Sequence, residues 1–418
     1  MNILIKSAVI IDENSTHHQQ QKDILIENGI ITRIANKISN PKNYKELRLK
    51  NLHVSCGWFD TSASFGEPGY EERETLQNGL KTAAKSGFTA VAINSNTDPA
   101  IDSKSIVEFL KSLSKNNIVD LYPIASLTKK SQGQELAELY DMQQSGAIAF
   151  GDYNKSIDNA NLLKIALLYT RNFDGLVLSY PQNSQIANNS SANEGINTTR
   201  LGLNGNPALA EELQIARDLF LLEYTGGKLH IPTITTAGSV RLLKDAKKKG
   251  LDVTCSVSAH HLSLTDQELS TFDSNYKVAP PLRTQNDLKA LTKGVEDGTI
   301  DMVTSDHNPI DIEHKKLEFE NALDGTIGLE SLFGAVNSVL NLNDTVKSLS
   351  VNPRKRFGLS QLTIKKGEKA NLTLFNPDST YIFTEDHIHS SSKNAAFLGK
   401  EMQGNVFGII ANNKISIH

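Results

Sequence analysis

Cysteine is scarce in this chain: Cys56 and Cys255 are the only two among 418 residues. Two thiols are too few for a disulfide framework or a cysteine-based zinc site, so both are expected to act as small buried hydrophobic residues. No apolar run is long enough to span a bilayer, and the N-terminal stretch lacks the layout of a signal peptide. These absences argue against a membrane protein and favour a cytoplasmic location.

A strong charge imbalance is also lacking. The chain has 43 Lys and Arg against 47 Asp and Glu, a formal net charge of -4, and its basic residues form no stripe. Binding to a phosphate backbone requires such a stripe, so nucleic acid is not an expected partner. With 39% apolar residues, the sequence predicts a globular protein with a large core and more than one domain.

Both ends of the chain have the pattern of β structure. β-Branched runs begin the chain, with an Asn28-Gly29 hairpin motif between two of them, and similar runs end it, with a turn at Asn412-Asn413. Neither end has enough strands to close a sandwich alone. We therefore predict one small β-sandwich domain built from residues 1–52 and 358–418.

The middle of the chain, residues 53–357, alternates between short apolar runs and helical patterns such as 75–87 and 207–227, which end on glycine. Parallel strands that are buried on both faces read as continuous apolar runs, so eight of them predict a TIM-type (β/α)8 barrel. The eight runs are Leu52–Phe59, Thr89–Ile93, Val119–Ala125, Ala147–Phe150, Gly175–Leu178, Lys228–Ile234, Asp252–Val257 and Ile300–Val303.

The functional residues of such a barrel lie just after its strands. The first stretch in that position, DTSASFGEPGY at residues 60–70, opens with an aspartate like a metal site but contains no histidine. The polar residues after the predicted strands are Ser62, Ser64, Asn94, Asn96, Thr128, Asp152, Tyr180, Thr233, His260, His261, Asp306 and His307. This set is polar but poor in metal ligands.

Asp306 is the strongest single candidate for chemistry, because a carboxylate after the eighth strand points into the barrel mouth. An aspartate before a turn can instead cap free backbone N–H groups, and Asp152 has the same two interpretations. The side chains of His260 and His261 are adjacent and diverge, so a structural role is favoured over metal binding for both. His230 lies within a strand, where core packing is the favoured interpretation.

Several stretches, in this order along the chain, resemble the dihydroorotase family of the amidohydrolase superfamily, in particular its bacterial type I branch. They are GEPGYEERETLQNGLKTAAKSGFTAV, NTDPAIDS, GLNGNPALAEELQIARD, YKVAPPLR, GTIDMVTSDHNP and NPRKRFGL. The resemblance implies a (β/α)8 barrel with a β-sandwich formed by both termini. It also implies a zinc centre that interconverts dihydroorotate and carbamoyl-aspartate.

The resemblance assigns the metal ligands, and most of them are replaced. Asp306 corresponds to the last ligand and general acid/base, and Asp152 is assigned to the metal-bridging acid of the family's S-D-D-G stretch. Four histidine ligand positions hold other residues: Ser62, Ser64, Tyr180 and Thr233. Of the substrate-binding positions, Asn96 is retained, whereas Gly66, Ala279 and Ile310 stand in place of an arginine, an asparagine and a histidine.

Two carboxylates do not make a zinc site, because catalytic zinc takes about three protein ligands rich in nitrogen or sulfur. Metal binding lowers the pKa of water from about 15.7 to about 7, which corresponds to roughly 12 kcal/mol in hydroxide availability. Asp306 as general base would supply only about 3 to 5 kcal/mol. We therefore hypothesise a pseudo-dihydroorotase without a cofactor that acts as a scaffold or regulator of aspartate transcarbamoylase, a role that the resemblance implies together with a possible homodimer.

Two alternatives remain open at this point. The first is an active cyclic amidohydrolase that uses zinc and acts on dihydroorotate, hydantoin or allantoin. Its rebuilt site would comprise Asp152, Tyr180, His260, His261 and Asp306. The second is a small-molecule sensor whose emptied pocket binds a pyrimidine intermediate without reaction.

Overall fold

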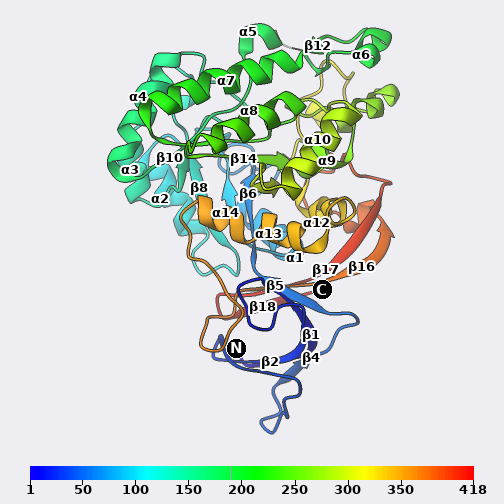
Figure 1. Ribbon diagram of the computed structural model, residues 1–418. Helices are drawn as coiled ribbons and strands as arrows, with labels where there is room; N and C mark the ends of the chain where they lie inside the picture. The colour runs from blue at the N-terminus through cyan, green and yellow to red at the C-terminus, as the bar shows by residue number, and fades with distance from the viewer. Residues whose placement is uncertain (189) are drawn as a thin grey trace.

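The computed structural model describes residues 1–188 and 190–418, which form a helix-covered barrel and a terminal β-sheet beneath it in the view of Figure 1. The barrel sheet has the strand order β15-β14-β13-β10-β9-β8-β7-β6, with parallel pairing between neighbours. Its strands are β6 (Trp58–Ala63), β7 (Phe88–Ile93), β8 (Asp120–Ala125), β9 (Ala149–Phe150), β10 (Leu176–Leu178), β13 (Lys228–Ile231), β14 (Val253–Ser258) and β15 (Met302–Thr304). Each of the eight predicted runs overlaps one of these strands, so the predicted (β/α)8 barrel is confirmed.

The first and last barrel strands meet just beyond their ends. The backbone N–H of Ser64 donates to the carbonyl of His307 at 2.6 Å, and Ala63 and His307 form a parallel bridge. The sheet therefore closes at its carboxyl edge, so the residues that follow β6 and β15 lie side by side there. Both strands are buried along their length, as parallel barrel strands are.

The helices that cover the barrel begin and end at residues typical of helix caps. Thr75 caps α1 (Leu76–Lys85) by accepting from the N–H of Asn78 at 3.2 Å, and Gly226 ends α7 (Ala208–Thr225) with a φ of 66°. The others are α2 (Lys104–Leu113), α3 (Leu139–Gln144), α4 (Ala160–Thr170), α8 (Ala237–Lys248), α9 (Ala259–Ser263), α10 (Gln285–Glu296), α12 (Leu329–Asn337), α13 (Leu342–Leu349) and α14 (Val351–Arg356). None of the helices in the described part of the chain combines the length and the apolar character that a membrane crossing needs.

The two ends of the chain pair with each other in the terminal sheet. Its order is β18-β17-β16-β5-β1-β2-β3, and β4 pairs with β1. Both predicted hairpins are present, with positive φ at Asn28, Gly29, Asn412 and Asn413 as two-residue turns require. The strands are β1 (Ile3–Ile11), β2 (Gln21–Glu27), β3 (Ile30–Ala35), β4 (Lys45–Leu47), β5 (His53–Cys56), β16 (Leu372–Ile382), β17 (Glu401–Ala411) and β18 (Lys414–Ile417).

The predicted run Leu52–Phe59 divides between the two sheets. Its first half is β5 of the terminal sheet, and its second half starts β6 of the barrel. Gly57 separates them at a tight crossing, where an added Cβ would lie 2.0 Å from Asn371 Oδ1. The terminal sheet thus takes residues up to Cys56, beyond the predicted boundary at residue 52.

Trp58 occupies the junction between the two parts. Its side chain is fully buried, and its ring centroid lies 5.5 Å from that of Phe375 on β16 and 4.8 Å from that of Phe333 on α12. The indole N–H donates to Ser55 Oγ at 3.0 Å, so its polar atom is satisfied. One aromatic cluster therefore joins the terminal sheet to the barrel.

Candidate functional site at the barrel mouth

Asp306 lies at the carboxyl edge of the barrel, as predicted, but its carboxylate is engaged by hydroxyl groups. Oδ1 accepts hydrogen bonds from Tyr153 Oη at 2.9 Å and from Ser62 Oγ at 3.1 Å. Asp306 has a φ of 45°, an uncommon backbone conformation for a residue other than glycine. The residue after β15 is thus turned toward the loops that follow β6 and β9.

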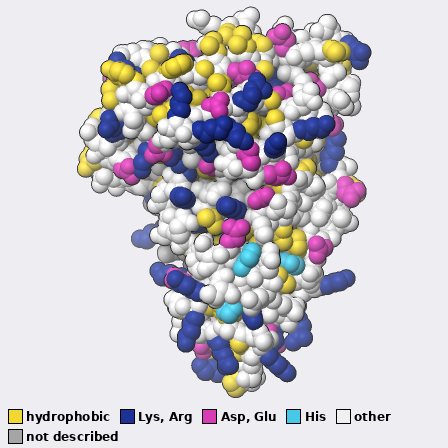
Figure 2. All heavy atoms as spheres, in the orientation of Figure 1, with side chains coloured by type: hydrophobic (Ala, Val, Ile, Leu, Met, Phe, Trp, Pro, Cys, Tyr) yellow, Lys and Arg dark blue, Asp and Glu magenta, His cyan; other side chains and the backbone are white. Residues whose placement is uncertain are grey.

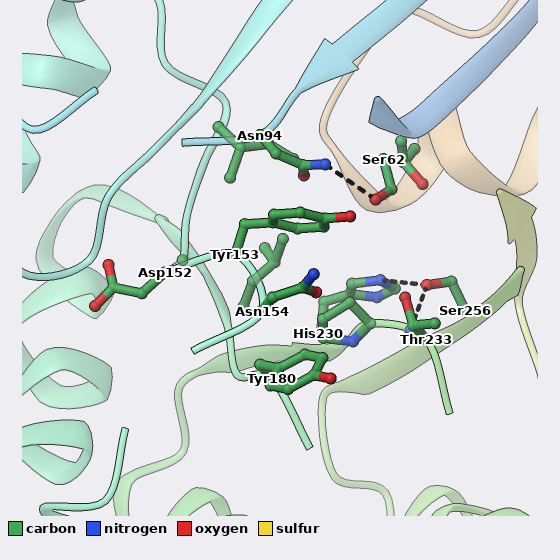
Figure 3. Close-up of a pocket in the computed structure, with 14 residues that line it drawn as sticks. Ser62, Asn94, Asp152, Tyr153, Asn154, Tyr180, His230, Thr233 and Ser256 are labelled. Atoms are coloured by element: carbon green, nitrogen blue, oxygen red, sulfur yellow. Dashed lines mark hydrogen bonds between the residues drawn. The ribbon is translucent and has the colours of Figure 1, made fainter. Parts of the chain in front are cut away.

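Asn94, after β7, extends this network. Its side-chain amide donates to Ser62 Oγ and Ser64 Oγ, each at 3.2 Å. Figure 3 shows the amide of Asn94 directed at Ser62, with the Tyr153 ring reaching across the pocket below them. Ser62 and Ser64, at the two positions that the resemblance assigns to histidine ligands, are therefore both engaged by hydrogen bonds within the protein.

Burial sets the protonation of this network. Burial raises the pKa of Asp306 to about 6, against the lowering effect of the hydrogen bonds from Tyr153 and Ser62. Burial and the neighbouring carboxylate of Asp306 raise the pKa of Tyr153 well above its usual value, so its hydroxyl keeps the proton that it donates. Asp60, whose carboxylate accepts from the N–H of Ser305 at 3.1 Å, has its pKa raised by burial to about 7.

Asp152 does not join Asp306. Its carboxylate accepts from the backbone N–H of Thr128 at 3.1 Å and from the Thr128 hydroxyl, and Figure 3 shows it pointing away from Tyr153 and the other labelled side chains. Of these two consecutive residues, Tyr153 therefore directs its hydroxyl at Asp306, whereas Asp152 directs its carboxylate at Thr128. The predicted pairing of Asp152 with Asp306 is therefore corrected, and Asp152 anchors a loop.

Tyr180 and Thr233 line the cavity, as predicted from their place after β10 and β13. The hydroxyl of Tyr180 is buried without a hydrogen-bond partner, and burial raises its pKa well above the usual value. Thr233 has a φ of 52°, which is a strained conformation for a β-branched residue. Neither side chain supplies a nitrogen ligand.

His230 is the one histidine that lines this cavity among the described residues. Its Nδ1 lies 2.9 Å from Thr254 Oγ1 and its Nε2 lies 3.3 Å from Ser256 Oγ. Burial lowers the pKa of His230 well below its usual value, so the ring is neutral. Both ring nitrogens have hydroxyl partners, in agreement with the predicted packing role.

His260 and His261 lie away from the mouth in α9. His261 Nδ1 lies 2.6 Å from Ser258 Oγ, and its Nε2 lies 2.9 Å from the carbonyl of Pro280, so both of its ring nitrogens are engaged. Neither histidine lines the cavity that Tyr180 and Asp152 border. The rebuilt site that would combine these histidines with Asp306 is not assembled.

The cavity at the mouth is small because side chains fill it. Its volume is about 30 Å³, far below the roughly 300–1,000 Å³ of small-molecule sites. Tyr153 and Asn154 line this cavity and also an outer pocket of about 720 Å³. These two residues therefore separate the interior of the mouth from a wide outer pocket.

Two of the four substrate-binding positions implied by the resemblance lie at that outer pocket. Asn96 and Ile310 line it, and Asn96 Oδ1 is buried without a partner. A Cβ at Gly66 would lie 1.9 Å from the carbonyl oxygen of Tyr70, so the loop has no room for the arginine of the family pattern. Ala279, half-buried before Pro280, lines neither the inner cavity nor the outer pocket.

The side chains around Asp306 do not fit a zinc ion. Its nearest polar neighbours are the hydroxyl groups of Ser62 and Tyr153, which direct their protons at the carboxylate oxygen. Zinc requires nitrogen, sulfur or carboxylate ligands with free lone pairs. Across residues 1–188 and 190–418, no three His, Cys, Asp or Glu side chains are grouped so that they could hold a metal ion.

Sequence reasoning missed Tyr153, the central side chain of the mouth. The family stretch S-D-D-G has two aspartates, and its alignment with Gly151-Asp152-Tyr153-Asn154 places Asp152 on the first and Tyr153 on the second. The structure shows that the second of these residues faces Asp306. The sequence shows that residue 153 is a tyrosine. It does not show which of the two consecutive residues, Asp152 or Tyr153, is directed at Asp306.

Comparisons with known proteins agree with the architecture. A family model described as "Dihydro-orotase-like" matches residues 53–239. The chain is 37% identical over 422 residues to a protein named dihydroorotase from Syntrophus aciditrophicus, with 99% of each chain covered. A dihydroorotase from Caldicellulosiruptor saccharolyticus is 39% identical, with 99% of this chain and 98% of that protein covered. Among solved structures, L-hydantoinase from Arthrobacter aurescens superposes with a TM-score of 0.86 at 19% identity, covering 100% of this chain and 96% of that one.

Proposed function

Because this chain belongs to the dihydroorotase family of the amidohydrolase superfamily, we propose that it keeps the family's barrel without its hydrolytic site. In this proposal it is a pseudo-dihydroorotase of pyrimidine biosynthesis that acts as a scaffold or regulator of aspartate transcarbamoylase. It has no resident metal. The closed hydrogen-bond network at the mouth is the observation that carries the loss of hydrolysis.

That network supports the proposal because it occupies the space where hydrolysis would take place. Tyr153 fills the mouth and donates to Asp306, and Ser62 donates to the same oxygen. Both hydroxyl groups thus converge on one carboxylate oxygen, Oδ1, from within the protein. The inner cavity of about 30 Å³ is far smaller than the roughly 300–1,000 Å³ of small-molecule sites, which supports the loss of substrate binding at this place.

The preserved barrel supports a role for the fold itself. Its eight strands, its closing bridge between Ala63 and His307, and the terminal sheet are all complete in the described residues. A protein that has lost its ligands but kept a full core is suited to hold or regulate a partner. Aspartate transcarbamoylase is proposed from the family resemblance, not from a surface of this chain.

Hydrolysis of a cyclic amide is the rival function, and the names of the relatives favour it. Proteins named dihydroorotase are 33–39% identical to this chain over nearly its whole length. The geometry weighs against it, because Asp152 is bound by Thr128 and His261 by Ser258 and Pro280. Among the described residues, no three metal-binding side chains are grouped.

Metal content and activity, measured on one sample, test the loss of hydrolysis. The purified chain is supplemented with zinc, desalted and divided between elemental mass spectrometry and a dihydroorotase assay, with the Syntrophus aciditrophicus relative carried through as the control. We expect no stoichiometric zinc and no turnover from this chain. Stoichiometric zinc together with turnover of dihydroorotate, hydantoin or allantoin would instead establish the rival function.

The scaffold role needs a separate test. The chain is mixed with aspartate transcarbamoylase from the same organism, and the mixture is followed by sedimentation and by carbamoyl transfer. We expect a complex and a change in transcarbamoylase activity or assembly. If the two proteins sediment independently and the transfer rate is unchanged, this partner is wrong even if the loss of hydrolysis is correct.

A further inference from the structure

A pocket lies at the seam between the barrel and the terminal sheet, away from the barrel mouth. Its volume is about 220 Å³, and it lies among α1, α12, β16, β17 and the residue that follows β18. Figure 1 shows these elements meeting below the barrel helices. Among the described residues, none that lines this pocket also lines the inner cavity or the outer pocket of the mouth. We call it the seam pocket.

Histidines are concentrated around the seam pocket. The chain has 11 histidines among its 418 residues, and His387, His389 and His418 all line this one pocket. The ring centroids of His389 and His418 lie 6.3 Å apart. Figure 2 shows histidine side chains on the surface of the lower half of the molecule, toward the terminal sheet. No described group of three His, Cys, Asp or Glu side chains is arranged to hold a metal ion, so this cluster is suited to hydrogen bonding rather than to metal binding.

Hydrogen bonds fix the tautomers of two of these rings. Lys85 Nζ lies 3.4 Å from His389 Nδ1, and because an ammonium group can only donate, this Nδ1 accepts. The backbone N–H of Thr384 donates to His387 Nδ1 at 3.1 Å. Each neutral ring therefore carries its proton on Nε2. Neither Nε2 has a hydrogen-bond partner in the described part of the chain, so both rings keep an unused N–H donor.

Lys85 is the cation of the seam pocket. It is half-buried at the end of α1, and within the described residues its ammonium group makes only the hydrogen bond to His389. Burial and the positive charge of Lys85 lower the pKa of both His389 and His418. The nearby Glu330 raises the pKa of His389, but by less. An anion in the pocket would therefore stabilise the protonated form of both rings.

The other charged groups near the seam pocket are engaged or exposed. Glu330 is buried, and its Oε1 accepts from the backbone N–H groups of His389 and Ser390 at 3.1 and 2.9 Å. Lys393 donates to two backbone carbonyls, both at 3.1 Å. Asp386 is exposed and lines the pocket. Because these carboxylates offset Lys85 at neutral pH, protonation of the imidazoles is needed to make the pocket positive.

Aromatic rings form part of the pocket wall. The Tyr381 ring centroid lies 4.8 Å from that of His387, and burial raises the pKa of Tyr381 to about 12, so its hydroxyl stays neutral. Phe333 packs against β17, where a Cβ at Gly404 would lie 2.5 Å from its Cε1. The volume is below the roughly 300–1,000 Å³ of drug-sized ligand sites. The pocket therefore suits a small polar ligand with at most a small organic group.

We propose that the seam pocket binds a small tetrahedral oxyanion, either free phosphate or the phosphate group of a monoester. Lys85 and the Nε2–H groups of His387 and His389 donate to its oxygens, and His418 adds positive charge when it is protonated. Hydrogen bonds between charged partners are the strong ones. The anion joins α1 of the barrel to the terminal sheet, so its binding stabilises the seam. The site is separate from the barrel mouth and does not depend on whether the mouth is active.

Calorimetric titration of the full chain with inorganic sulfate tests the site. Sulfate is the first probe because its charge is the same at pH 6 and pH 8, so that any pH dependence comes from the protein. At constant ionic strength, we expect one sulfate to bind per chain at pH 6, with affinity at least about tenfold weaker at pH 8. Lack of saturable binding at pH 6, or equal affinity at the two pH values, would overturn the proposal.

Substitution of Lys85 tests whether sulfate binds in the seam pocket. Lys85→Met is expected to weaken sulfate binding at pH 6 by at least about tenfold. Lys81→Met is the matched control, because Lys81 is an exposed lysine one turn earlier on α1 and does not line this pocket. Circular dichroism checks that both variants are folded. Equal weakening by the two substitutions would mean that sulfate responds only to overall charge, which contradicts a specific site.

Histidine titration followed by NMR tests the contact in the unmodified chain. Sulfate is expected to raise the pKa of His389, whose signal is assigned with His389→Gln. The titration of His17, in the loop after β1, is the reference that sulfate should leave unchanged. If sulfate binds without altering the titration of His389, it binds elsewhere and the proposal is wrong.

Two further probes distinguish the sources of the oxyanion. Inorganic phosphate and phenyl phosphate are titrated under the same conditions. If the ligand is a monoester, phenyl phosphate should bind about threefold more tightly or better, because its ring can pack on Tyr381 and Phe333. Equal affinities would support the free anion as the ligand.

Discussion

The hydroxyl of Tyr153 lies 2.9 Å from Oδ1 of Asp306 and joins the loop after β9 to the loop after β15 across the barrel mouth. These two loops belong to strands that are not neighbours in the sheet. A direct bond between them means that protein side chains occupy the centre of the mouth. Substitutions at the mouth should therefore change the stability of this chain.

Tyr153→Phe should lower the free energy of unfolding by about 1–2 kcal/mol, because it removes a buried hydrogen bond and leaves the Asp306 carboxylate with one donor fewer. Tyr180→Phe is the matched control, since the Tyr180 hydroxyl is buried without a partner and its removal should be neutral or stabilising. Urea denaturation at neutral pH measures both variants. Equal effects of the two substitutions would show that the bond to Asp306 contributes nothing.

Asp306→Asn should stabilise the protein at neutral pH. Burial raises the pKa of Asp306 from 3.8 to about 6, so the native state binds the proton more tightly than the unfolded state does. The free energy of unfolding therefore falls as the pH rises from about 4 to about 6, by up to about 3 kcal/mol. The variant, which lacks this titration, should gain stability over the unmodified chain at pH 7 but not at pH 4.

Thermal unfolding at a series of pH values measures this difference. Glu27→Gln serves as a control of opposite sign, because the hydrogen bond from Lys42 lowers the pKa of Glu27 to about 2. That variant should lose the most stability above the unfolded-state pKa of about 4.5, and the loss should fade as the pH falls toward about 2. A gain for Asp306→Asn that is the same at pH 4 and pH 7 would contradict the titration of Asp306.

Thr233→Gly should stabilise the chain by roughly 0.5–1 kcal/mol or be neutral, although glycine usually weakens a protein. Thr233 has a φ of 52°, where a β-branched side chain is strained and glycine is not. Thr254→Gly, in strand β14, is the comparison and should destabilise by the usual amount or more. If denaturant unfolding shows the same loss in the free energy of unfolding for both variants, the backbone conformation of Thr233 does not destabilise the protein.

Zinc binding should return if the lost ligands are restored together with the inward-facing acid. The five substitutions are Ser62→His, Ser64→His, Tyr153→Asp, Tyr180→His and Thr233→His. Imidazole nitrogens and two carboxylates then surround the mouth, so the variant should retain zinc through desalting. The matched control keeps Tyr153 and carries the four histidines; because the tyrosine ring still fills the mouth, it should retain much less zinc.

The barrel was predictable because strands buried on both faces leave continuous apolar runs, and each run overlaps a barrel strand. The division of the first run, Leu52–Phe59, between the terminal sheet and the barrel was not predictable. The residues on both sides of Gly57 favour β structure equally, and only contacts with Asn371 and Thr89, distant in sequence, fix the crossing there.

The candidate site was predictable as a set of positions but not as a set of contacts. Ser62, Tyr180 and Thr233 line the mouth cavity, and Asp306 accepts a hydrogen bond from Ser62 beside it. The Asp152 carboxylate is bound by Thr128 instead, whereas the Tyr153 hydroxyl binds Asp306. A shift of one residue after a strand reverses the direction of a side chain. Strand β9 has only two residues, Ala149 and Phe150, so its short apolar run gives little periodicity from which to infer that direction.

Trp58 gives this chain a built-in optical probe. It is the only tryptophan among the 418 residues, and it is packed between Phe375 of the terminal sheet and Phe333 of the barrel. Its fluorescence emission therefore reports on one place, the seam where the two halves of the fold meet. A red shift that precedes the loss of far-ultraviolet circular dichroism during unfolding would mark separation of the halves before either one melts.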